Sequence, residues 1–150
     1  MTDTLLPTGV TPHLVCNNAA AAIDFYTLAF GATEMVRLPG KDGRLIHAAV
    51  VINGGVVMLV DEFPEMMGAS PTTLGGSPVT LHLAVPDARA AIAKAAAAGA
   101  VVTMAPELMF WGDLYGMVTD PFGHVWSIAT PMGGPTTTEG LAAALKDAGQ

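Results

Sequence analysis

The sequence predicts an α+β fold made of two βαβββ modules whose strands form a cupped mixed sheet. Three observations support this prediction: an internal repeat, the same order of strand and helix signals in each copy, and the composition of an ordinary domain. The chain has 150 residues, 51% hydrophobic and 13% charged. This composition excludes disorder over most of the length and provides enough apolar residues for one core.

The repeat is visible in the sequence itself. The segment 10–14 (VTPHL) matches 79–83 (VTLHL), so that His13 corresponds to His82 at an offset of 69 residues. The same offset carries an AAI triplet at 21–23 onto 90–92, and one residue of slippage aligns AFGA at 29–32 with AAGA at 97–100. Three matches in the same order indicate a duplicated module.

Each copy begins with a short strand followed by an alanine-rich helix. Strands are predicted over 13–16 and 81–85, and helices over 19–30 and 88–98. Asn17-Asn18 and Pro86-Asp87 are typical of helix starts, and Gly31 and Gly99 are typical of helix ends.

Three strands are predicted after each helix. In the first copy they cover 33–38, 44–52 and 56–61, and in the second copy 101–104, 114–119 and 125–130. The glycine-rich connectors at 39–43, 53–55 and 120–123 are typical of turns between strands.

The predicted organisation is a single domain over 10–131, with modules at about 10–62 and 79–131 and a linker over 63–78. Residues 1–9 form an N-terminal extension, and 132–150 form a C-terminal tail. Thr136 and Glu139 have the spacing of a capping box, which predicts a short helix in that tail.

The net charge of the chain indicates which classes of binding partner are disfavoured. Thirteen acidic and six basic residues give a formal charge of −7, which argues against nucleic-acid binding. The sequence has neither an apolar run of membrane-spanning length nor a signal peptide, and its single cysteine, Cys16, fits a reducing compartment. We therefore expect a cytoplasmic protein with no nucleic-acid or membrane partner.

Two motifs resemble a known family. The helix sequence AAAIDFY at 20–26 followed by AFGA, and the turn DPFGH at 120–124, resemble the vicinal oxygen chelate superfamily, which includes glyoxalases, bleomycin-resistance proteins and dioxygenases. The resemblance covers about residues 10–131. Segments 61–65, 74–79 and 110–116 further resemble its PhnB-like branch.

The resemblance implies the glyoxalase/bleomycin-resistance fold, usually as a homodimer, with a small-molecule site in the cup of the sheet. Metal-dependent members hold a divalent ion with four side chains, two from each module. The matching positions here are Thr11, Met58, Thr80 and Ser127. None of these is the imidazole or carboxylate that such ions require, so no metal cofactor is expected.

His13 and His82 are the candidate catalytic residues. Each lies two residues beyond the matching ligand position, on the same face of its strand, and the repeat allows the two histidines to face each other. They are expected to act as acid/base or ligand-contact groups, or else as hydrogen-bonded structural residues. A divalent metal held weakly by this pair stays open as an alternative.

Five residues are candidates for substrate binding: His47, Phe110, Trp111, Asp113 and Tyr115. The aromatic members lie near Gly112 and Gly116 and are suited either to stacking on a flat ligand or to packing the loop on the sheet. Asp113 is a candidate partner for the loop backbone or for a ligand amine. His47 follows a period-two pattern that does not decide which face of its strand it takes.

Three other features carry weaker expectations. His124 is expected at the surface of its turn. The acidic group Asp61, Glu62 and Glu65 either steers a cationic ligand or forms a solvated turn. Cys16 lies near a helix N-terminus, where a thiolate is favoured.

The sequence thus supports two functions. The first is metal-free binding or sequestration of a small molecule. The alternative is a glyoxalase-like lyase, isomerase or dioxygenase that acts on a small oxygenated metabolite through His13 and His82.

Overall fold

The computed structural model describes residues 7–66 and 68–149 and contains two four-stranded mixed sheets. The first sheet has the order β1-β4-β3-β2. Its strands and the helix between the first two are β1 (His13–Cys16), α1 (Ala19–Phe30), β2 (Thr33–Pro39), β3 (Leu45–Ile52) and β4 (Gly55–Asp61). Strand β1 runs parallel to β4, and the other neighbours are antiparallel.

The second sheet repeats this arrangement as β5-β8-β7-β6. Its elements are β5 (Thr80–Ala84), α3 (Ala88–Ala97), β6 (Val101–Leu108), β7 (Asp113–Thr119) and β8 (Val125–Pro131). The parallel pair is again the first and last strand of the module. The predicted fold of two βαβββ modules is therefore confirmed.

The repeat also holds at the level of strand register. His13 lies opposite Met58 in the β1–β4 pair, and His82 lies opposite Ser127 in the β5–β8 pair. Both residues of the second pair follow those of the first at the offset of 69 seen in the sequence. The two modules therefore align strand by strand.

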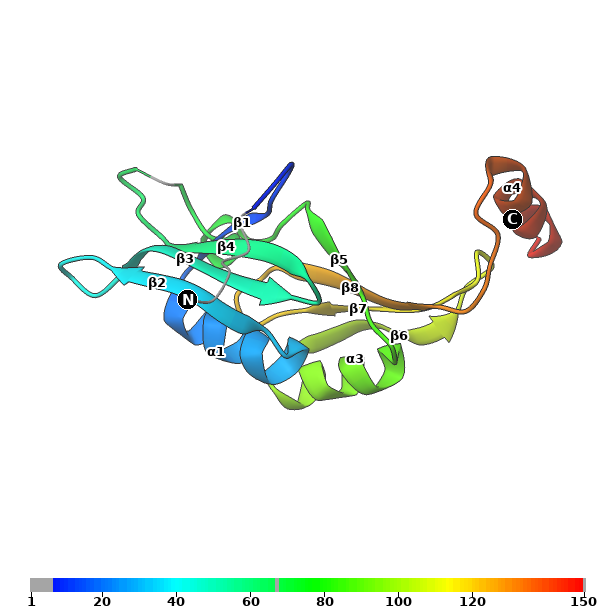
Figure 1. The fold of residues 1–150 in the computed structure, drawn as a ribbon, viewed down its shortest axis with the longest axis horizontal. Helices are drawn as coiled ribbons and strands as arrows, with labels where there is room; N and C mark the ends of the chain where they lie inside the picture. Colours follow the sequence, from blue (N-terminus) through cyan, green and yellow to red (C-terminus); the bar gives the residue numbers. More distant parts are fainter. Residues whose placement is uncertain (1–6, 67, 150) are drawn as a thin grey trace.

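One hydrophobic core joins the modules. Helices α1 and α3 contact each other on the same side of the two sheets (Figure 1). Trp126 of β8 reaches across the module boundary, with its ring centroid 5.4 Å from that of Tyr26 and 4.9 Å from that of Phe30 on α1. The buried cluster includes residues of both modules, so the modules share one core.

The helix starts follow from local chemistry. The side chains of Asn18 and Asp87 accept hydrogen bonds from the backbone amides of Ala21 and Ala90 and thereby cap α1 and α3. Gly31 ends α1 in the left-handed conformation, with φ of 68°, which favours glycine because it lacks a Cβ. None of the helices among the described residues is long and apolar enough to cross a membrane.

The linker contains a helix that the sequence did not predict, and the tail contains the short helix that it did. The linker holds the short helix α2 (Pro71–Leu74). The tail forms α4 (Thr138–Asp147), which stands away from the sheets at the end of the molecule (Figure 1). Thr137, rather than the predicted Thr136, caps α4 by accepting a hydrogen bond from the Gly140 amide, because the helix begins one residue later than the capping-box spacing suggested.

Candidate functional site

The second sheet has one face against the helices and one open face. A Cβ added to Gly116 would lie 2.5 Å from Cδ1 of Ile92 on α3, so Gly116 faces the helix layer. Tyr115, its neighbour on β7, therefore faces the other way, because successive residues of a strand alternate between faces. Met117 shares that open face and lies opposite Ser127.

A histidine–serine pair occupies the centre of this open face. Nδ1 of His82 lies 2.7 Å from Oγ of Ser127 on the neighbouring strand, within hydrogen-bond distance. Ser127 is buried, at 2% exposure, whereas His82 is exposed. The hydroxyl thus anchors one ring nitrogen of His82.

A row of aromatic rings extends from this pair along the same sheet. The His82 and Tyr115 rings are stacked, with centroids 6.1 Å apart and planes 20° from parallel. The Tyr115 ring meets Trp111 edge to face at 5.4 Å, and Trp111 meets Phe110 in the same way at 5.0 Å. The indole N–H of Trp111 donates a hydrogen bond of 3.0 Å to Asp113. The predicted aromatic residues therefore form one continuous surface with His82.

The open face of the first sheet carries two histidines, His13 and His47. His13 and Met58 are strand neighbours, and Met58 lies opposite Ala49, so His47, two residues before Ala49, lies on the same face as His13. The pKa of His13 is held below its ordinary value, first because partial burial disfavours the imidazolium and second because His47 lies nearby.

The two candidate catalytic histidines belong to separate groups. His13 lies with His47 and lines a cavity of about 290 Å³ together with Ser77 and His124. His82 lies with Ser127 and Tyr115. The two histidines therefore have different surroundings: His13 lines a cavity together with Leu81 and His124 of the second module, whereas His82 contacts Ser127.

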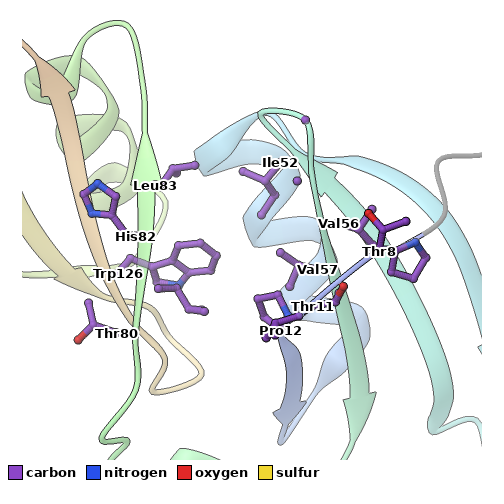
Figure 2. A pocket seen from close by; sticks show the side chains of 15 residues that line it. Thr8, Thr11, Pro12, Ile52, Val56, Val57, Thr80, His82, Leu83 and Trp126 are labelled. Atoms are coloured by element: carbon purple, nitrogen blue, oxygen red, sulfur yellow. The ribbon is translucent and has the colours of Figure 1, made fainter. Parts of the chain in front are cut away.

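A cavity of about 440 Å³ separates the modules, and its lining includes Thr11 and Thr80. Figure 2 shows the side chains of Ile52, Val57 and Trp126 directed into this gap, whereas the His82 ring lies on the far side of β5. The lining of this gap is part apolar and part polar and also includes His82, so the gap adjoins the polar group on the open sheet face.

The residues at the family's metal positions do not fit a divalent ion. Thr11, Met58, Thr80 and Ser127 provide two threonine hydroxyls, a thioether and a serine hydroxyl in place of imidazoles and carboxylates. Over residues 7–66 and 68–149, no three His, Cys, Asp or Glu side chains come together as a group able to hold a metal.

Two expectations for single residues were wrong. Cys16 is fully buried, and burial followed by the nearby Asp120 and Asp61 carboxylates raises the pKa of its thiol, so a thiolate is disfavoured. His124 is also buried, at 8% exposure. Its Nε2–H donates a hydrogen bond of 3.0 Å to the Val15 carbonyl and so connects the last turn of the second module to β1.

The acidic group at the module boundary divides: Asp61 and Glu62 bind the backbone, whereas Glu65 lies exposed in a turn, as one of the two alternatives expected, 3.5 Å from Arg44. Asp61 is buried and accepts hydrogen bonds of 2.7 Å from the amides of Ala19 and Leu45. Glu62 accepts hydrogen bonds from the amide of Ser70 and the hydroxyl of Thr73, and these bonds lower the pKa of its carboxyl. These two carboxylates therefore hold the chain in place.

Asp120 was missed as a central structural residue. It is 4% exposed and accepts four hydrogen bonds. Their donors are the Tyr26 hydroxyl, the Trp126 indole, and the amides of Phe122 and His124. Only the bonds from the amides could be expected from the sequence, because an aspartate before Pro-Phe-Gly is typical of a turn. The contacts to distant aromatic residues depend on how the modules pack.

Comparison with known proteins defines the family. The sequence model of the Glyoxalase/Bleomycin resistance protein/Dioxygenase superfamily matches residues 8–128. An uncharacterised protein of Mycobacterium bovis is 51% identical over 126 residues, which are 82% of this chain and 83% of that protein. The X-ray structure of an Arabidopsis thaliana gene product is 32% identical with a TM-score of 0.65, over 83% of this chain and 99% of that one.

More distant structures share the fold. A PhnB protein from Bacillus cereus is 18% identical with a TM-score of 0.63, over 82% of this chain and 99% of that one. At this identity the likeness shows the fold alone. The family match covers both modules and ends before α4. This chain belongs to the glyoxalase/bleomycin-resistance/dioxygenase superfamily.

Proposed function

We propose that this protein binds a small, flat molecule on the open face of its second sheet, without a resident metal ion. The observation that carries the proposal is the continuity of a polar group with an aromatic surface. The His82 ring is anchored by Ser127 at 2.7 Å and stacks with Tyr115, which leads to Trp111. A site that combines aromatic walls with a few fixed polar atoms is typical of ligand pockets.

Binding or sequestration is favoured over metal-dependent catalysis by the donor chemistry. Two threonines, a methionine and a serine stand where the family's metal-dependent members use stronger ligands. Ligand recognition then depends on stacking, shape and hydrogen bonds from His82, with contributions from His13 and His47 on the other open face.

The proposal also includes the oligomeric state, the branch of the superfamily and the cellular location. The open faces carry exposed apolar side chains, among them Val36, Leu38 and Val101, and a homodimer in which a second copy covers these faces would bury them. The segments at 61–65, 74–79 and 110–116 support the PhnB-like branch. A cytoplasmic location is supported by the single cysteine.

A second candidate function is acid/base catalysis at His82, as in a glyoxalase-like lyase or isomerase. The Ser127 hydroxyl fixes the ring at Nδ1, which leaves Nε2 directed away from this bond to exchange a proton with a substrate. His13 would serve the same role in the first module. Dioxygenase chemistry requires a redox metal, which the four ligand positions do not favour.

A thermal-shift screen of aromatic acids, quinones and oxygenated metabolites tests the proposal. We expect a compound that raises the melting temperature of the native protein and of Asp24→Asn, an exposed control on α1, but not of a His82→Ala/Tyr115→Ala variant. A compound that stabilises all three proteins equally would contradict the assigned site. Product formation from that compound, abolished by His82→Ala alone, would favour the enzymatic alternative over sequestration.

A further inference from the structure

The C-terminal helix forms one wall of a second groove. This groove has a volume of about 800 Å³ and lies between α4 and the loop that joins β6 to β7. Leu141 and Leu145 line it from the helix, and Phe110 and Trp111 line it from the loop. Its size falls within the range of small-molecule sites, about 300–1,000 Å³.

The tail crosses the β6–β7 loop at close range just before α4 begins. Met132 donates a backbone hydrogen bond of 2.9 Å to the carbonyl of Gly112. A Cβ added to Gly134 would lie 2.0 Å from the carbonyl oxygen of Trp111, and one added to Gly112 would lie 2.2 Å from the Cα of Gly134. Only glycines permit this approach, so the tail is seated on the loop and leaves the groove beyond it.

Helix α4 has apolar side chains without a core to fill. None of its residues is buried, and Leu145 is 38% exposed. Its leucines at positions 141 and 145 are one helical turn apart and share a face. That face lies across the groove from the aromatic loop and is available to a ligand.

The charge in the groove selects the kind of ligand. Among the residues of 7–66 and 68–149 that line it, Asp113 alone is charged, and none is a lysine or arginine. One oxygen of Asp113 accepts the Trp111 indole hydrogen bond, which fixes the carboxylate beside the indole ring. The whole chain carries a formal charge of −7, which also favours a cation.

We propose that this groove binds a flat aromatic cation, with its rings between Trp111 and the leucines of α4 and its positive group at Asp113. A cation beside aromatic faces gains from the ring quadrupole, and the carboxylate adds a charge-assisted hydrogen bond. The site lies outside the matched family region on the α4 side. It shares Trp111 with the proposed ligand site but is tested by different residues.

The test uses proflavine, a flat three-ring cation at neutral pH, and acridine, its largely uncharged parent, with binding followed by fluorescence polarisation. We expect tighter binding of proflavine. Asp113→Asn is expected to weaken proflavine binding by about ten-fold, and to leave acridine binding unchanged. Leu141→Ala/Leu145→Ala is expected to weaken the binding of both dyes, and alanine keeps α4 helical.

Matched controls separate the groove from general effects. Asp24→Asn removes the same charge from α1, and Leu28→Ala/Leu74→Ala removes two other exposed leucines; both controls are expected to bind proflavine like the native protein. Equal binding of the two dyes, or an affinity for proflavine that the groove variants leave unchanged, would overturn the inference.

Loss of binding only in His82→Ala would place the dye in the proposed ligand site and also overturn it. A change of oligomeric state in Leu141→Ala/Leu145→Ala, seen by light scattering without a change in dye affinity, would assign the groove to a second copy instead.

Discussion

The Tyr26 hydroxyl, on the helix of the first module, donates a hydrogen bond to the carboxylate of Asp120 in the second module. Burial and this carboxylate together raise the pKa of Tyr26 well above its ordinary value, so the phenol stays protonated and acts as the donor. Because the same carboxylate oxygen accepts the Trp126 indole hydrogen bond at 2.9 Å, Asp120 joins side chains from both modules at their boundary.

Tyr26→Phe removes this donor while keeping the ring. We expect the free energy of unfolding to fall by about 1–3 kcal/mol, because a buried charged acceptor loses one of its partners. Urea denaturation followed by circular dichroism measures the change. Tyr115→Phe, on the open sheet face, is the matched control and is expected to leave stability nearly unchanged. Equal losses in the two variants would contradict the role given to Asp120.

Ser127→Ala removes the hydrogen-bond partner of the His82 Nδ1 atom. We expect the ring to lose its fixed tautomer, since the hydroxyl no longer restrains one nitrogen. Nitrogen-15 chemical shifts of the histidine rings report this directly by NMR. The His124 ring is an internal control because it donates to the Val15 carbonyl and its shifts should not move. Unchanged His82 shifts would show that Ser127 does not position the ring.

The depressed pKa of His13 predicts a pH dependence of stability. The ordinary value is 6.5, and partial burial and His47 lower it in the folded protein. The unfolded chain therefore binds more protons than the folded protein between the folded pKa and 6.5, so stability is retained above 6.5 and falls as the pH drops below it.

Unfolding midpoints of the native protein and His13→Asn, measured in urea across this pH range, check that sign. The variant should lose less stability on acidification, because asparagine does not titrate. An equal loss in both proteins would assign the effect to other groups.

The Cys16 thiol is predicted to be unreactive in the folded protein. It has no exposed surface, and burial raises its pKa, with further increases from Asp120 and Asp61, so little thiolate forms at neutral pH. A disulfide exchange reagent should report a slow reaction in buffer and one fast thiol in urea. A fast reaction without denaturant would mean that the first module opens readily.

The fold was predictable because local signals agreed with the repeat. Helix α1 was predicted at its observed bounds by an asparagine cap and a terminal glycine, and both features are present in the structure. Strand β6 was predicted to end at Met104 but continues to Leu108. Pro106 concealed the extension, because proline is tolerated only where a strand lies at the edge of a sheet, and the edge position of β6 depends on tertiary structure.

The sequence predicted which residues belong to the site better than it predicted which of them contact one another. Trp111, Asp113 and Tyr115 do form one connected cluster, as their closeness in sequence suggested. The pairing of His82 with Ser127, rather than with His13, required knowledge of which strands are neighbours. Buried roles such as those of His124 and Asp120 depend on contacts between modules, which no local pattern contains.

The matched register of the two modules has a consequence for protein engineering. Met58 and Ser127 each lie opposite a histidine on a neighbouring parallel strand. A carboxylate substituted at either position would thus stand beside an imidazole without any change in the backbone, and those two groups are common metal ligands. The duplicated scaffold thus offers two equivalent positions for such a pair, so a metal site could be introduced by a few side-chain changes without a new fold.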